Sequence, residues 1–231
     1  MTPAPQDFIA PGEFVDSSTP AVARFTRRVL GGVDGPTVDG RAVDPVTSAV
    51  RLFEAVRDDI WYDPYSVSAD PGHHRASTVA TADRTYCIPK AVLLAAAARA
   101  AGIPARLGFA DVRNHLQTPA LRERMNGSEL FVFHGYAEMW LRGRWVKATP
   151  AFNAELCDRF GVSAMAFDGV HDALLHQYGA DGARHMEYVH DRGWYADLPF
   201  GEIMRAFREH YADSFIADEA READLFHDGT A

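Results

Sequence analysis

Cysteine is scarce in this chain of 231 residues, which has only Cys87 and Cys157. Two cysteines are too few for a small scaffold held by disulfides, and they offer no pair at zinc-ligand spacing. The composition therefore favours a reducing, cytoplasmic setting and gives no sign of a bound metal or cofactor.

Basic clusters are also missing. The chain has 23 Lys and Arg against 32 Asp and Glu, a formal charge of -9, and its acidic residues are spread along the sequence. Nucleic acids and anionic membranes both attract clustered positive charge. We therefore expect neither as a partner, and the sequence carries no signal of oligomeric state.

Long apolar runs are absent as well. The first residues lack the basic and apolar segments of a secretory leader, and the most apolar stretch, residues 91–101, is interrupted by Arg99 and is too short to cross a bilayer. Neither a repeat nor a long Pro/Gly/Ser linker divides the chain. We expect a single domain over residues 1–231, with residues 1–14 loose and 221–231 frayed.

Local signals place the first helices. One is predicted from Pro20 to Leu30, ending at Gly31-Gly32, and a second begins at Asp44-Pro45, where Asp caps the helix and Pro suits its first turn. The following stretch, WYDPYSVSADPGHHRAS, contains Asp-Pro pairs that interrupt regular structure. It is predicted to be a long loop, and a closing helix is predicted near residues 200–210.

A helix is predicted over residues 87–101, CIPKAVLLAAAARAA. Its residues are good helix formers, Pro89 is tolerated in the first turn, and Gly102 suits the C-terminal end. The helix is apolar on nearly every face, which is typical of a helix buried on all sides.

Cys87 opens this helix. The unpaired N–H groups and the positive dipole end of a first helical turn lower a thiol pKa and can stabilise an oxyanion. The alternative is that Cys87 is a small buried apolar residue, as most free cysteines are. Lys90 is interpreted as a solvated first-turn lysine, and Cys157 as a packing residue.

Three strands are predicted after the helix. ARLGFADV forms the first, a polar loop follows up to Gly127, and residues 129–141 and 144–149 form a hairpin closed by Arg142-Gly143. A two-residue turn places three pairs opposite one another, which are stabilising cross-strand partners: Trp140 and Trp145, Glu138 and Lys147, Tyr136 and Thr149.

His134 lies within the hairpin. Strict alternation places it on one face, together with Leu130, Val132, Tyr136, Glu138 and Trp140. From this mixed face it could act as a general base towards Cys87 and then as a general acid. The other histidines, which we expect to be structural or solvated, are His73, His74, His115, His171, His176, His185, His190, His210 and His227.

Two segments resemble the transglutaminase-like superfamily, a branch of the papain-like fold: TYCIPKAVLLAAAARAAGIPARLGFADV and FHGYAEMWLRGRWVKATP. The resemblance implies an α+β fold in which a buried helix, carrying a cysteine at its N-terminal end, packs on an antiparallel sheet. It also implies that Cys87 is the nucleophile and His134 the base.

The sequence departs from the family pattern at two positions. Tyr86 stands where the family often has Gly, and Thr149-Pro150 stands where the third catalytic residue is usually Asp followed by Pro. A Thr149 hydroxyl can accept a hydrogen bond from the imidazole, but it cannot stabilise imidazolium as a carboxylate does. Asn153 is a second candidate for orienting His134, and Thr149 could also be an ordinary residue at a strand end.

These observations predict a cysteine-dependent acyl-transfer enzyme. Its substrate would carry an amide or ester, a class that includes peptides and proteins, and hydrolysis is favoured over cross-linking. Two alternatives remain open at this point. One is a binding or scaffold domain that has kept the fold without efficient chemistry, and the other is a metal-dependent hydrolase using the scattered histidines.

Overall fold

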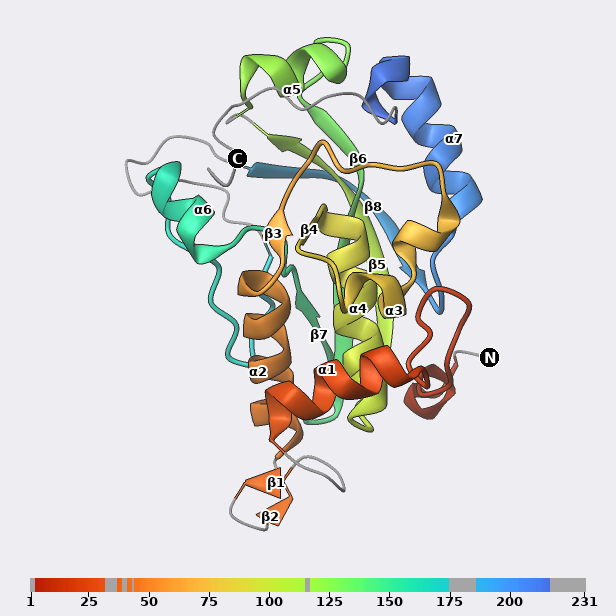
Figure 1. Cartoon of the computed structure of the whole chain (residues 1–231), viewed down its shortest axis with the longest axis vertical. Coiled ribbons are helices and arrows are strands. Elements are labelled where there is room, and N and C mark those ends of the chain that lie inside the picture. Colours follow the sequence, from red (N-terminus) through yellow and green to blue (C-terminus); the bar gives the residue numbers. More distant parts are fainter. Residues whose placement is uncertain are drawn as a thin grey trace.

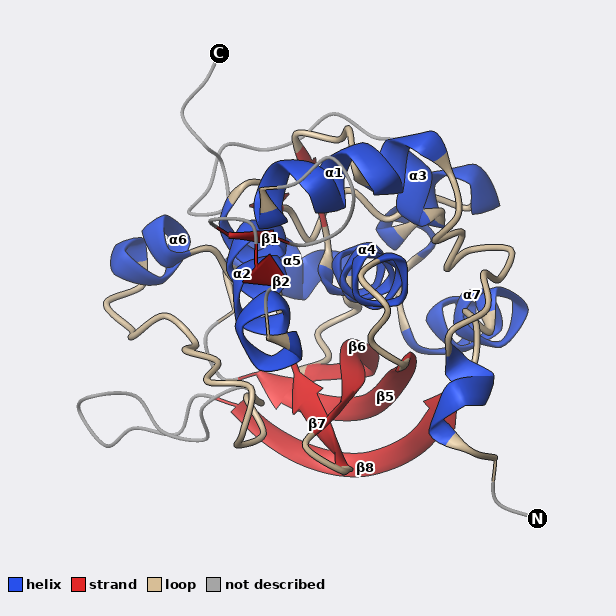
Figure 2. Cartoon of the chain, turned by 90° about the horizontal axis from the view of Figure 1, so that it is seen from below, coloured by secondary structure: helices blue, strands red, loops and turns tan. Residues whose placement is uncertain are grey.

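A computed structural model of the chain shows a four-stranded antiparallel sheet curled around one helix, α4 (Cys87–Ala100). Figure 2 looks along α4, which lies inside the curve of the sheet. The structure describes residues 3–31, 44–114, 117–174 and 186–216, together with the backbone of 37–38 and 41–42. The expected α+β class is confirmed.

The sheet has the strand order β7-β6-β5-β8. Its strands are β5 (Ala105–Asn114), β6 (Leu130–Leu141), β7 (Arg144–Ala148) and β8 (Met186–Tyr195). The predicted hairpin register is confirmed for the pairs Trp140–Trp145 and Glu138–Lys147. One short helix, α5 (Pro119–Arg124), lies in the stretch predicted to be a polar loop, with the Thr118 side chain capping it at Leu121 N.

Helices α1 (Pro20–Leu30), α2 (Pro45–Asp58) and α3 (Ala76–Val79) cover the side of α4 that faces away from the sheet, and α7 (Phe200–His210) flanks it (Figures 1 and 2). The Asp44 carboxylate accepts from the N–H groups of Val46 and Thr47, so it caps α2 as predicted. Gly31 closes α1 with a φ of 72°.

Short elements make up much of the rest. The predicted long loop contains β3 (Trp61–Tyr62), the 3-10 helix Pro71–His74 and α3 before it reaches β4 (Arg84–Thr85), which pairs in parallel with β3 and leads into α4. The others are the 3-10 helices Pro5–Phe8 and Asp213–Phe215, the strands β1 (Thr37–Val38) and β2 (Arg41–Ala42), and α6 (Ala154–Arg159).

Burial of α4 is nearly complete, because every residue from Cys87 to Arg99 is buried. This confirms the prediction of a helix surrounded on all sides. Across the described residues, none of the helices is both long and apolar enough to cross a membrane.

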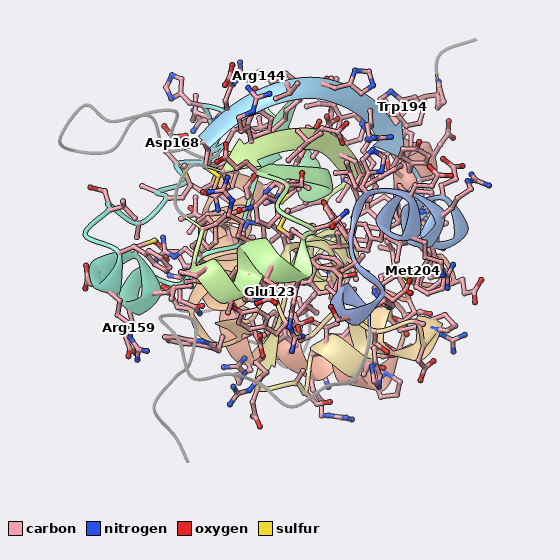
Figure 3. The ribbon with its side chains drawn as sticks, turned by 90° about the horizontal axis from the view of Figure 1, so that it is seen from above. Glu123, Arg144, Arg159, Asp168, Trp194 and Met204 are labelled. Atoms are coloured by element: carbon pink, nitrogen blue, oxygen red, sulfur yellow. The ribbon has the colours of Figure 1, made fainter. Side chains whose placement is uncertain are left out.

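The N-terminal segment differs from expectation. Most of residues 3–14, expected to be loose, are exposed, but the segment is held at two points: Phe8 and Phe14 are buried, and the Asp197 carboxylate accepts from the N–H groups of residues 13–15. Phe8 packs edge-on against Trp145 and Trp194 on the face of the sheet turned away from α4. Trp194 lies at this outer face (Figure 3). The expected frayed tail, residues 221–231, lies outside the described residues.

Candidate active site

Cys87 is the first residue of α4, and its Sγ lies among backbone amides. Burial raises the pKa of the Cys87 thiol to about 11, while the backbone N–H groups of Gly135, Ile88 and Cys87 itself act in the opposite direction by stabilising the thiolate. The site therefore offers the donors that an anionic sulfur needs, but it holds the resting thiol protonated.

Gly135 allows β6 to lie close to the start of α4. A Cβ on this residue would be 3.1 Å from the Ile88 Cα and 3.4 Å from the Phe109 Cε1. Both contacts are tight for a carbon atom in a packed interior. The absence of a side chain at Gly135 therefore lets the thiol reach the backbone of the strand that carries His134.

His134 directly precedes Gly135 and is buried, with 4% of its surface exposed. Burial lowers the pKa of the His134 imidazole to about 4, so at neutral pH the ring is uncharged. Its Nε2 has no hydrogen-bond partner. In the described part of the chain the imidazole and the thiol belong to adjoining elements, and no hydrogen bond joins them.

The strand faces differ from strict alternation at one point. His134 pairs with Ala110, yet Phe131 pairs with Val112, so β6 has one residue more than β5 between these pairs. The extra residue forms a β-bulge in which Phe133 has a φ of 56°. Phe131, rather than Leu130 and Val132 as expected, therefore shares the face of His134.

Thr149 follows the end of β7. Its N–H donates to the Ala173 carbonyl, and its buried Oγ1 has no hydrogen-bond partner. The ladder ends at the pair Ala137–Ala148, and one further step of the same register places Thr149 opposite Tyr136, two residues from His134. The two unpaired polar atoms of the site are thus not bonded to each other.

Asn153 is engaged elsewhere. Its Oδ1 accepts from Tyr62 N at 2.7 Å, and its Nδ2 donates to the carbonyls of Arg57, Asp58 and Ile60. These bonds use both ends of the amide. The alternative in which Asn153 orients His134 is therefore wrong, and the residue instead ties the end of α2 to β3.

Lys90 is fully buried, so its interpretation as a solvated lysine is also wrong. Its Nζ donates to three main-chain oxygens, those of Arg57, Ile60 and Ala151, at 2.7–2.8 Å. Burial lowers the Lys90 pKa well below its ordinary value. This side chain joins the first turn of α4 to the end of α2 and to the segment after Thr149.

Three buried tyrosines lie near enough to Cys87 to be affected by its charge: Tyr62, Tyr86 and Tyr211. The sequence pattern singled out only Tyr86, as a departure from the family. Burial raises the pKa of each, and negative charge at Cys87 acts in the same direction. The Tyr86 hydroxyl lies 2.7 Å from the Nε2 of His74, and Tyr211 accepts from Val132 N on β6. Aromatic residues spaced far apart in a sequence give no local signal of such a grouping.

The remaining predictions concern the other histidines, the second cysteine and Glu138. His74 is buried and structural, whereas His115, His176, His185 and His227 lie outside the described residues. No group of three or more His, Cys, Asp or Glu among the described residues could hold a metal ion. Cys157 is buried in α6.

Glu138 faces Lys147 as predicted, but its closer partner is Arg106. The Arg106 Nε lies 2.6 Å from the carboxylate, whereas the Lys147 Nζ is 3.9 Å away. The Arg106 guanidinium also stacks over Trp145 and Trp194. Glu138 therefore belongs to a structural ion pair on the outer face of the sheet.

A buried helix that begins at a cysteine and packs on a curled antiparallel sheet carrying a histidine is the arrangement of the transglutaminase-like class within the papain-like folds. Residues 36–150 match the family model of the transglutaminase-like superfamily. The chain belongs to this superfamily.

One solved structure that matches part of this chain is described as a "Putative Cysteine Protease from Cytophaga hutchinsonii". The similarity covers 63% of this chain and 41% of that chain, with a TM-score of 0.43 and 18% sequence identity. This chain thus spans less than half the length of that protein. Comparison with curated proteins gives no match.

Proposed function

We propose that the protein is a cysteine-dependent acyl-transfer enzyme in which Cys87 is the nucleophile and His134 the acid–base group. The observation that carries the proposal is the position of the Cys87 thiol at the first residue of α4, against the backbone N–H of Gly135, the residue after His134. Membership of the transglutaminase-like superfamily supports it.

The chemistry follows from these groups. His134 takes the thiol proton as Cys87 Sγ forms a bond to the carbonyl carbon of an amide or ester, and backbone N–H groups at the start of α4 stabilise the resulting oxyanion. The carbonyl re-forms when the leaving amine or alcohol departs with the proton from His134. Water or an amine then attacks the thioester, and the proton returns to the thiolate through His134.

The substrate in this proposal carries an amide or ester, a class that includes peptides and proteins, and hydrolysis is favoured over cross-linking. The Cys87 thiol and the His134 imidazole are both uncharged at rest, which is compatible with this acyl-transfer scheme. Transfer of the thiol proton to His134 would create an ion pair, so the titration would belong to the pair rather than to either residue alone.

A second candidate function is a binding or scaffold domain with little remaining chemistry. Two observations favour it: the buried Cys87 and His134 both rest uncharged, and Thr149 supplies no negative charge for an imidazolium. The two functions differ in the reactivity of the thiol.

Alkylation by iodoacetamide separates the two functions. In a Cys157→Ser background, which leaves Cys87 as the only thiol, we expect alkylation to stay fast below pH 7 and to slow by about tenfold or more in His134→Ala. Cys87→Ser gives the background signal. A pH profile of an ordinary thiol with a pKa near 8.5, unchanged by His134→Ala, would contradict the enzyme and favour the binding domain.

A further inference from the structure

The residue before His134 has an unusual backbone. Phe133 is a bulky residue with a φ of 56°, at the β-bulge where Val132 and Phe133 both lie opposite Asp111 of β5. L-residues with large side chains rarely adopt this left-handed conformation. Such a conformation persists only where the surrounding structure holds it in place.

Asp111 supplies this support. Its Oδ1 accepts from the Phe133 N–H at 3.0 Å, and the side chain is buried, so the bulged amide has a charged acceptor that does not exchange with water. The bulge interrupts the ladder between β5 and β6 at this point, and a carboxylate takes the place of the missing backbone partner.

Arg192 of β8 completes the arrangement. Its Nε and Nη2 lie 2.5 Å and 2.9 Å from the two carboxylate oxygens of Asp111, and its guanidinium lies 4.2 Å from the centre of the Phe133 ring. The two-point ion pair fixes the direction of the carboxylate, and the stacking fixes the Phe133 side chain. Three neighbouring strands are thus joined at one backbone position.

The position matters because a bulge sets the phase of a strand. Relative to the residues on one side of the bulge, those on the other side point to the face opposite to the one that strict alternation would give them. Loss of the extra residue would therefore turn one part of β6 over. His134 and Gly135 directly follow the bulge. The orientation of the imidazole and the amide that contacts Cys87 therefore both depend on the conformation of Phe133.

We propose that Asp111 and Arg192 are positioning residues, which hold the bulge at Phe133 and thereby orient His134 and the Gly135 amide towards Cys87. This inference rests on the proposed thiol chemistry. Neither side chain needs to touch the substrate, since both act through the backbone of β6.

The test compares two ion pairs of the same sheet, each formed by a buried carboxylate and a partly buried arginine. Asp111→Ala removes the support of the bulge, Asp111→Asn keeps an acceptor for Phe133 N–H, and Glu138→Ala breaks the Arg106 pair four residues beyond His134. Cys87 alkylation at pH 6.5, the pKa of His134 by NMR, and the melting temperature are measured for each variant.

We expect similar losses of melting temperature in Asp111→Ala and Glu138→Ala, because each leaves one partly buried arginine without its carboxylate. Only Asp111→Ala should slow the alkylation of Cys87, by about tenfold or more, and change the His134 pKa. Asp111→Asn should recover most of the wild-type rate and pKa. Equal alkylation rates and equal His134 pKa values in Asp111→Ala and Glu138→Ala would overturn the inference.

The two proposals fail in different ways. If the Cys87 thiol of the wild-type protein reacts like an ordinary thiol, the proposed acyl-transfer function is contradicted. Even then, a His134 pKa that changes in Asp111→Ala but not in Glu138→Ala would support the role of Asp111 in positioning His134. Conversely, an activated thiol that depends on His134 but not on Asp111 would remove only the positioning role.

Discussion

At the scale of single residues, Thr149 limits how well the Cys87–His134 pair can hold separated charges. An imidazolium formed next to a thiolate is stabilised by a carboxylate, whereas a hydroxyl offers only a weak dipole. In the structure neither the His134 Nε2 nor the Thr149 Oγ1 has a hydrogen-bond partner. Thr149 makes no bond to the His134 imidazole, and a longer, charged side chain at position 149 could reach towards it.

The first prediction is that Thr149→Asp increases the reactivity of Cys87. The added carboxylate should raise the pKa of His134 from its low value and stabilise the imidazolium, and we expect Cys87 alkylation at pH 6.5 to rise by about tenfold. Thr149→Asn is the matched control, with the same size as Asp but no charge, and should have little effect. Equal rates in the Asp and Asn variants would show that position 149 does not act on His134 electrostatically.

At the scale of secondary-structure elements, the site depends on the contact between the start of α4 and β6. Gly135 lies at this contact, and a Cβ built on it would meet Ile88 of α4 at 3.1 Å and Phe109 of β5 at 3.4 Å. Added volume there must move the helix away from the strand, because the backbone of Ile88 cannot rotate aside as a side chain does.

The second prediction is therefore that Gly135→Ala separates Cys87 from the Gly135 amide. We expect a loss of about 1–3 kcal/mol in the free energy of unfolding, measured by urea denaturation, together with slower alkylation of Cys87. Gly201→Ala is the control, because a Cβ at that position of α7 meets nothing within 4 Å. The prediction is contradicted if Gly135→Ala matches this control in stability and thiol reactivity.

The elements were predictable where their signals are local. Asp44-Pro45 marks the start of α2, and Arg142-Gly143 marks the turn of the hairpin whose register followed from complementary pairs. The bulge at Phe133 was not predictable in this way, because its support comes from Arg192 and Asp111, which are 81 residues apart. Alternation along β6 alone therefore placed Val132 on the wrong face.

At the scale of the whole molecule, the same distinction applies to the candidate site. The family pattern identifies Cys87 and His134 as candidates, but the roles of Lys90 and Asn153 depend on carbonyls at the end of α2, which lie about 30 and 90 residues away in the sequence. A buried amine or amide finds its partners through the tertiary fold. The spacing of Lys90 and Asn153 in the sequence therefore could not show whether these residues act in the site or make structural bonds.

Burial also couples the stability of the whole molecule to pH. The imidazoles of His74 and His134 are buried, and each has its pKa lowered from 6.5 to about 4. The unfolded chain therefore binds more protons than the folded protein between these values, so the free energy of unfolding falls as the pH drops through this window. Each histidine should remove about 2 kcal/mol of stability between pH 7 and pH 5.

The third prediction tests this coupling through His74, which can be replaced without altering the proposed nucleophile or base. His74→Gln removes one titrating group, so between pH 7 and pH 5 the free energy of unfolding of this variant should fall by about 2 kcal/mol less than that of the wild type. At pH 7 the variant should be less stable than the wild type, because it loses the bond to Tyr86. The wild-type protein gives the reference slope, measured by urea denaturation at each pH. Equal slopes in His74→Gln and the wild type would mean that His74 titrates in the folded protein much as it does in the unfolded chain.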